Sequence, residues 1–224
     1  MCGIAGLINF DNSYIDSIKK SLYHRGPDSQ THFQHNNLHL IHTRLSIQDI
    51  KNGDQPYRIG QYIIVFNGEI YNHLELRKHI KKHTFKTLCD TETLLALFIE
   101  YGFNSLEMCD GMFAFIIYDI EKNKLILARD RIGKKPIYLY KNQKQIFIAS
   151  ELNTFKDLIP NLSINESSIS SFLRVGFFHE SSTPFKEIEE IIPGHIYEIN
   201  ISIADRGVKS VSVSYTHLTL PTNP

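Results

Sequence analysis

The chain has 224 residues, 42% of them hydrophobic and 21% charged, a balance typical of a globular protein with one large domain or two small ones. Its 24 Lys and Arg residues equal its 24 Asp and Glu residues, which argues against nucleic acid or an anionic membrane as a partner. Three widely spaced cysteines form no disulfide framework, and neither a signal peptide nor an apolar run of about 20 residues is visible. We therefore expect a cytoplasmic protein that binds neither nucleic acid nor a membrane.

The first half of the chain alternates between predicted strands and helices. Ile4–Phe10 is apolar almost throughout and predicts a strand, and Tyr14–Tyr23 predicts a short helix. Two strands are expected around the turn signal Asn36-Asn37, and Tyr62–Phe66 has the composition of a buried strand.

Two helices are predicted after that buried strand. Asn72 with Glu75 resembles a capping box, so a helix would run from about His73 to His83. Within it, lysines flank His79 and His83, which favours a solvated helix face, and we expect no metal site. A second helix is predicted after Asp90, where the apolar residues fall on one helical stripe.

The second half begins with four short β runs, "GMFAFIIYDI", "NKLILARD", "PIYLYK" and "QIFIAS", whose turn-rich spacers predict a meander. "ELNTFKDLI" and "ESSISSFLRVGF" then predict helices. The order of strands, helices and strands favours an α+β architecture over strict βαβ alternation. We expect one domain over residues 1–199.

The segment from about Asp205 differs in composition. It is rich in Ser, Thr and Val, it has no clear partner strand, and its last stretch resembles a translated sequencing adapter. We expect residues 200–224 to be a linker stub followed by a non-native tail. A native Ser/Thr-rich linker is the alternative.

Cys2 directly follows the initiator Met1. In one interpretation it is a small buried residue, as free cysteines often are. In the other, Met1 is removed, and Cys2 then carries both a thiol nucleophile and a free α-amine. An α-amine has an ordinary pKa of about 7.7–8.0, so it is a suitable base for the thiol near neutral pH.

Asn67 and Gly68 end the predicted buried strand. Asn-Gly is a strong hairpin signal, but a helix pattern follows here instead of a returning strand. The alternative is a two-donor oxyanion hole, with the side-chain amide of Asn67 and the backbone N–H of Gly68 as donors.

Three charged residues are candidates for binding an amino-acid zwitterion. Arg44 lies among apolar strand residues, where it either points outward or holds a carboxylate with its planar fork. Glu69 and Asp90 are candidate anions for an ammonium group, although Asp90 is also a good helix N-cap. The segment "ARDRIGKKP" lacks the glycine and hydroxyl of a phosphate loop and predicts a cationic turn.

Taken in order, "MCGIAG", "HRGPDS", "HTRLSI", "NGEIYNH", "DTETLLAL", "DGMFAFIIYD", "ARDRIGKKPIYLY" and "ASEL" resemble the glutaminase domain of glutamine-hydrolysing asparagine synthetases. That domain is a class II glutamine amidotransferase of the N-terminal-nucleophile hydrolase type. The resemblance covers Met1 to about Ile199, and it implies a four-layer αββα sandwich of two antiparallel sheets.

The resemblance also implies roles at the matching positions. Cys2 would attack the side-chain amide of L-glutamine, and Asn67 and Gly68 would form the oxyanion hole. Arg44 would hold the α-carboxylate, Glu69 and Asp90 the α-amine, and Arg25 and Gly26 would shape the loop near Cys2. The backbone lining the site would come from Leu45, Ser46, Ile47 and Gln48.

The full enzymes carry a second, synthetase domain with an ATP-pyrophosphatase loop, which nothing in this sequence matches. We therefore expect the ammonia-producing part of a truncated enzyme, with the missing synthetase domain as its partner in cis. This domain itself needs no cofactor, whereas ATP and magnesium are expected only in the missing domain.

Two alternatives stay open. The ammonia acceptor could be another molecule, such as a sugar, instead of aspartate. The domain could also be a binding module that holds glutamine without turnover, although the intact thiol of Cys2 argues against it.

Overall fold

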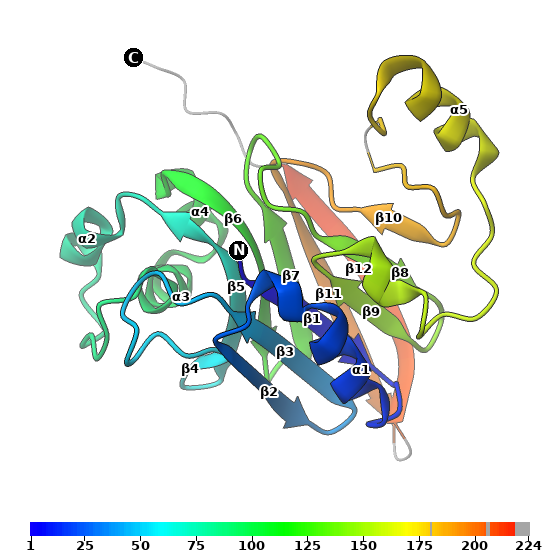
Figure 1. Ribbon diagram of the computed structural model, residues 1–224. Helices are drawn as coiled ribbons and strands as arrows, with labels where there is room; N and C mark the ends of the chain where they lie inside the picture. The colour runs from blue at the N-terminus through cyan, green and yellow to red at the C-terminus, as the bar shows by residue number, and fades with distance from the viewer. Residues whose placement is uncertain (180, 205–206, 218–224) are drawn as a thin grey trace.

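The computed structural model describes residues 1–179, 181–204 and 207–217. Two antiparallel sheets of six strands each face one another (Figure 1), which confirms the α+β expectation. The first sheet has the order β10-β8-β9-β1-β3-β2, and the second has the order β12-β11-β7-β6-β5-β4.

The bounds of the elements are as follows. The strands of the first sheet are β1 (Gly3–Ile8), β2 (Ser29–His35), β3 (Leu38–Arg44), β8 (Tyr138–Lys141), β9 (Ile146–Ala149) and β10 (Ile188–Glu190). Those of the second are β4 (Tyr57–Ile59), β5 (Tyr62–Ile70), β6 (Gly111–Asp119), β7 (Lys124–Arg129), β11 (His195–Ala204) and β12 (Gly207–His217). The α-helices are α1 (Tyr14–Ser21), α2 (His73–Leu76), α3 (Asp90–Tyr101), α4 (Ser105–Met108) and α5 (Glu166–Val175). The 3-10 helices are η1 (Tyr23–Arg25), η2 (Arg77–His79), η3 (Gly102–Asn104) and η4 (Leu152–Phe155).

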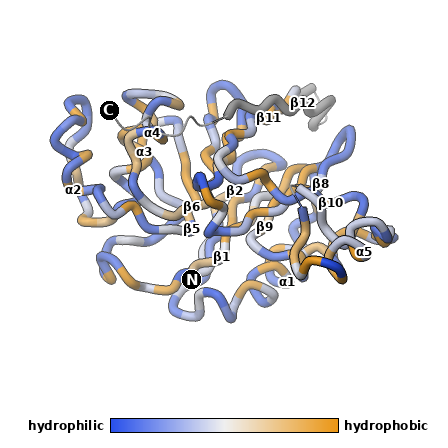
Figure 2. The backbone as a smooth tube through the Cα atoms, turned by 90° about the horizontal axis from the view of Figure 1, so that it is seen from above, coloured by the Kyte–Doolittle hydropathy of each residue, from blue (hydrophilic) through white to orange (hydrophobic). Residues whose placement is uncertain are grey.

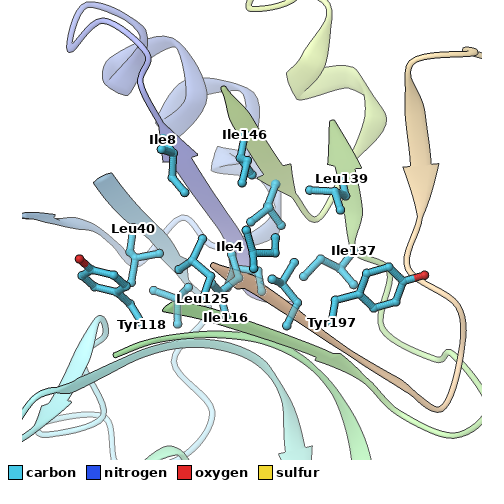
Figure 3. Packing of buried hydrophobic residues seen from close by; sticks show 14 of the residues in the cluster. Ile4, Ile8, Leu40, Ile116, Tyr118, Leu125, Ile137, Leu139, Ile146 and Tyr197 are labelled. Atoms are coloured by element: carbon cyan, nitrogen blue, oxygen red, sulfur yellow. The ribbon is translucent and has the colours of Figure 1, made fainter. Parts of the chain in front are cut away.

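Three apolar clusters hold the layers together. Because side chains alternate between the faces of a strand, β6 sends Ile116 into the cluster between the sheets and Phe115 into the cluster under α3. Figure 3 shows the inner cluster, where Ile4 of the first sheet and Ile116 of the second are fully buried. The third cluster packs Ile18 of α1 on the outer face of the first sheet. The result is the expected αββα layering.

Several predicted boundaries and pairings need correction. The four β runs do not form one meander, because β6 and β7 belong to the second sheet and β8 and β9 to the first. The segment "ARDRIGKKP" carries the chain from one sheet to the other. Strand β5 continues through Asn67 and Gly68 to Ile70 and pairs with β6, which lies far along the chain. Asn67-Gly68 is therefore not a hairpin turn, as the helix pattern after it indicated.

The helix expected from His73 to about His83 is also wrong. Helix α2 ends at Leu76, and after η2 the chain becomes extended at Ile80. Asn72 does not cap α2; its side chain binds the backbone of Met108 and Asp110 instead. His83 lies outside any helix and binds the buried carboxylate of Glu92 at 2.8 Å.

The end of the chain is more regular than its composition suggests. The expected domain boundary at residue 199 falls inside β11, and β12 pairs with β11 in antiparallel register. That residues after 205 are non-native stays a prediction, and residues 205–206 and 218–224 lie outside the described residues. In the described part of the chain, no helix is both long and apolar enough to cross a membrane.

Candidate active site

The residues singled out in the sequence meet in one pocket, the Cys2 pocket. Figure 1 marks the N-terminus beside β5 and β6, and Met1 and Cys2 line the pocket with residues from β3, β5 and the start of α3. The residues that line it are Met1, Cys2, His42, Arg44, Leu45, Ile47, Gln48, Gly53, Gln55, Phe66, Asn67, Gly68, Glu69, Cys89, Asp90, Thr91, Met112 and Lys135. Of the predicted residues, Arg25, Gly26 and Ser46 lie outside this lining, and the N–H of Ser46 donates to Asp28 at 2.7 Å.

The thiol of Cys2 is held against the backbone that follows β3. The N–H of Leu45 donates to Sγ at 3.4 Å, and Sγ lies 3.7 Å from the carbonyl oxygen of Leu45. Burial raises the pKa of the Cys2 thiol, while the Leu45 N–H, the N-terminal amine and Arg44 oppose that rise. Asp90 adds to the rise. Burial therefore disfavours the thiolate, and a base near the thiol would help it to form.

The pocket offers no titrating histidine for that task among the described residues. His42 lines the pocket, but burial and then the charge of Arg44 lower its pKa to about 3. A group with so low a pKa is a poor proton acceptor near pH 7. The α-amine of a processed Cys2 is the remaining candidate for the base.

Arg25 connects Cys2 with Asn67. It is 8% exposed, and its Nε donates to the carbonyl oxygen of Cys2 at 3.0 Å while Nη1 donates to Glu151 at 2.8 Å. With the Asn67 amide oriented to complement its neighbours, Oδ1 accepts from Arg25 Nη2 at 3.2 Å and Nδ2 donates to the Cys2 carbonyl at 3.1 Å. An amide nitrogen has two hydrogens, so one is left for a further acceptor at this pocket-lining residue.

Gly68 follows Asn67 in β5 and lies against β6. A Cβ atom at position 68 would come within 2.3 Å of the carbonyl oxygen of Met112, so only glycine fits there. Gly26 is equally constrained, because a Cβ would lie 2.2 Å from the carbonyl oxygen of Thr43. Both glycines allow the close approach of backbone segments beside Cys2.

Arg44 is bound to the loop that follows it. Nη1 donates to the carbonyl oxygen of Ile50 at 3.1 Å and to Asp54 at 2.8 Å, and Nη2 donates to the carbonyl oxygens of Gln48 and Asp49 at 3.2 and 2.8 Å. The planar fork therefore shapes the 48–54 loop in this structure. Its binding of a substrate carboxylate stays a prediction.

The two predicted anions are joined through Gln48. Its side-chain amide donates to Glu69 at 3.2 Å and accepts from the backbone N–H of Asp90 at 3.3 Å. Asp90 is not an N-cap: Cys89 holds that position, and the Asp90 carboxylate accepts from the N–H of Ile70 in β5 at 3.0 Å. Burial raises the pKa of Asp90, so a bound ammonium would stabilise its charged form.

Sequence reasoning missed the contributions of Glu151 and Lys135. Glu151 belongs to the quoted motif "ASEL", yet nothing local indicates that it would bind Arg25. Lys135 lies in the cationic turn and is 7% exposed. No group of three or more His, Cys, Asp or Glu side chains with metal-binding geometry occurs in the described part of the chain.

The comparisons with known proteins agree with this geometry. A family described as glutamine amidotransferase domains matches residues 1–209. Over 211 residues the chain is 34% identical to a glutamine-hydrolysing asparagine synthetase of Bacillus subtilis, covering 89% of this chain and 33% of that protein. A similar enzyme of Lotus japonicus is 40% identical over 166 residues, covering 70% of this chain and 28% of its own length. The chain thus spans about a third of the curated relatives it matches.

Solved structures show a similar fold. The glutamine phosphoribosylpyrophosphate amidotransferase of B. subtilis, complexed with ADP and GMP, aligns with a TM-score of 0.64 at 21% identity. The alignment covers 99% of this chain and 50% of the other. An allosteric regulatory enzyme of purine biosynthesis aligns with a TM-score of 0.60 at 22% identity, covering 93% and 48% of the two chains. At these identities the likeness concerns the fold alone.

Proposed function

The chain belongs to the family of glutamine amidotransferase domains, and from this premise we propose that it hydrolyses the side-chain amide of L-glutamine through Cys2. The observation that carries the proposal is the meeting, in one pocket, of a thiol, an oriented amide donor and a close-packed glycine at Cys2, Asn67 and Gly68. The first two are a nucleophile and an oxyanion donor, which acyl transfer requires.

The proposed reaction starts with removal of Met1, which is 53% exposed and lines the pocket. The α-amine of Cys2 accepts the thiol proton as Sγ forms a bond to the side-chain amide carbon of glutamine. The carbonyl oxygen becomes an oxyanion, which the second N–H of the Asn67 amide and the backbone N–H of Gly68 would stabilise.

Collapse of this intermediate breaks the carbon–nitrogen bond. The proton on the α-amine passes to the departing nitrogen, so ammonia leaves and a thioester remains on Cys2. Water then attacks the thioester with the α-amine again as base, which gives glutamate and restores the thiol.

Charged residues around the pocket support an amino-acid substrate. Glu69 and Asp90, held together by Gln48, supply negative charge for the α-ammonium group. Arg44 would meet the α-carboxylate by exchanging part of its contacts with the 48–54 loop. The backbone from Leu45 to Gln48 would line the substrate.

We further propose that the ammonia serves a synthetase domain, with aspartate as the acceptor. The asparagine synthetases that this chain resembles support the proposal, because the chain matches about a third of their length. ATP and magnesium would act in that second domain. A different acceptor is the alternative, and the residues of the second domain would decide between them.

The first experiment measures glutamate and ammonia release from glutamine by the processed protein, after mass spectrometry has shown Cys2 to be the first residue. We expect turnover without ATP and no asparagine from ATP and aspartate. Binding of glutamine without release of ammonia would favour a binding module instead.

A further inference from the structure

The turn between β7 and β8 brings a buried lysine into the Cys2 pocket. Lys135 is 7% exposed and lines the pocket together with Cys2, Asn67 and Glu69. Its Nζ lies 3.1 Å from Sδ of Met1, the residue that precedes Cys2. A thioether is only a weak acceptor, so this contact compensates little of the cost of burying an ammonium group.

The position of Lys135 is fixed by its own turn. The carboxylate of Asp130 accepts hydrogen bonds from the N–H groups of Ile132, Lys134 and Lys135 at 2.9 to 3.2 Å. From the other side, Arg129 Nε donates to the carbonyl oxygen of Lys135 at 3.0 Å. Hydrogen bonds hold the backbone of Lys135 on both sides, so the fold itself directs the lysine side chain into the pocket.

The charge of Lys135 is not neutralised by an ion pair. No carboxylate among the described residues lies within 4.0 Å of its Nζ, whereas Arg25 is paired with Glu151 and Arg44 with Asp54. The charged residues that line the pocket with Cys2 are Arg44 of β3, Glu69 of β5, Asp90 of α3 and Lys135 of the turn after β7. Arg25 of η1 and Asp130 of the same turn act on the charge of Lys135. Lys135 is the unpaired cation of this set.

We propose that Lys135 is a further functional residue of this site: after removal of Met1, its buried ammonium stabilises the Cys2 thiolate and disfavours protonation of the Cys2 α-amine. Both effects have the same sign, because a nearby positive charge lowers the pKa of a thiol and of an amine. This inference rests on the proposed function, in which the thiol of Cys2 is the nucleophile and its α-amine is the base.

The electrostatic surroundings of Lys135 agree with this role. Burial lowers the pKa of Lys135, and Arg25 adds to the lowering. The charges of Asp130, Cys2 and Glu69 act in the opposite direction. A Cys2 thiolate and the Lys135 ammonium therefore favour one another, and removing either should weaken the charged form of the other.

The test compares the processed wild type with Lys135→Met, Lys135→Arg and the control Lys134→Met. Lys134 is exposed on the same turn, so its substitution changes the net charge equally without entering the pocket. The first readout is the rate at which iodoacetamide alkylates the Cys2-containing peptide as a function of pH. It needs no glutamine turnover, so it separates failure of this inference from failure of the proposed function.

We expect Lys135→Met to move the alkylation profile and the acid limb of kcat/KM about one pH unit upward, a loss of about tenfold near pH 7. Lys135→Arg should keep the wild-type profile, and Lys134→Met should match it. Superimposable profiles for Lys135→Met and wild type would overturn the proposal. Should Lys135→Met not fold, as judged by circular dichroism, Lys135→Gln replaces it with the same expected shift.

Discussion

The Cys2 pocket and helix α5 differ in the kind of side chain that they bury and expose. In the pocket, polar side chains are buried: Asn67 is 1% exposed, Asp90 4% and Arg44 5%. Along α5 and the residues after it, apolar side chains are exposed, with Leu173 at 79% and Phe177 at 55%. Figure 2 shows α5 at one end of the molecule, with apolar residues recurring along it.

The difference distinguishes residues that build the candidate site from residues that contribute little to the stability of the fold. A buried polar group costs free energy unless it is bound, so each one in the pocket requires a partner. An exposed apolar side chain contributes little to the stability of this chain alone. Substitutions should therefore affect the two regions very differently.

The largest expected effect is that of Cys2→Ala. Glutamine turnover should be abolished, because no other thiol of the described chain is accessible in the pocket: Cys89 lines it but is 6% exposed, and Cys109 is buried elsewhere. The fold should persist, since a small residue replaces a small one. Ammonia release and the thermal unfolding midpoint measure the two effects, and residual turnover above background would remove Cys2 from the mechanism.

Glu151→Gln should have the next largest effect. Without the carboxylate, Arg25 loses its ion pair and the Asn67 amide is no longer held with Nδ2 toward Cys2. Misplacing one oxyanion donor should lower kcat by about a hundredfold with little change in KM. Steady-state kinetics test this, with His24→Gln as the control, since His24 binds the same carboxylate from an exposed position. Equal losses in both variants would contradict the special role of Arg25.

Glu92→Gln should act on stability. Burial alone would raise the pKa of Glu92, but hydrogen bonds from His83, Lys86 and Thr87 hold it at about 2 instead of 4.5. A lowered carboxyl pKa stabilises the fold above pH 4.5, and that stability is lost as the pH falls from about 4.5 toward 2. We expect Glu92→Gln to cost about 2 kcal/mol at pH 7.

Urea unfolding at several pH values checks this prediction. The wild type should lose more stability than Glu92→Gln between pH 4.5 and pH 2, so the two curves should converge in acid. Parallel curves would show that the Glu92 carboxylate is not preferentially charged in the folded protein.

The smallest expected effect is that of Leu173→Ser in α5. Because Leu173 is 79% exposed, its replacement should change the free energy of unfolding by less than about 0.5 kcal/mol and leave glutamine turnover unchanged. Urea unfolding and the ammonia assay measure both. A large loss of either would mean that α5 is part of the cooperative core, and the contrast with the pocket would fail.

The sequence predicted the buried strands well, because their signal is local. The apolar runs around Phe66 and along β6 indicate buried strands, and Asn36-Asn37 marks the turn between β2 and β3. Motif order then placed Cys2, Asn67 and Asp90 together, and the structure does bring them to one pocket.

What could not be predicted depends on long-range packing. The residues of the turn "ARDRIGKKP" do not indicate that the strands on its two sides, β7 and β8, belong to different sheets. Arg25 and Glu151 are 126 residues apart in the chain, and only the fold brings η1 beside the segment that follows β9. The capping box at Asn72 failed because the backbone of Met108 and Asp110 binds the same side chain.

The most direct test of the account compares one protein before and after exposure of its N-terminus. The chain is expressed behind a cleavable tag whose removal leaves Cys2 as the first residue, and glutamine turnover is measured in both forms. We predict turnover only after cleavage, because in the tagged form the base is an amide nitrogen with no basic lone pair although the thiol is intact. Equal turnover by both forms would contradict the claim that the Cys2 α-amine is the base.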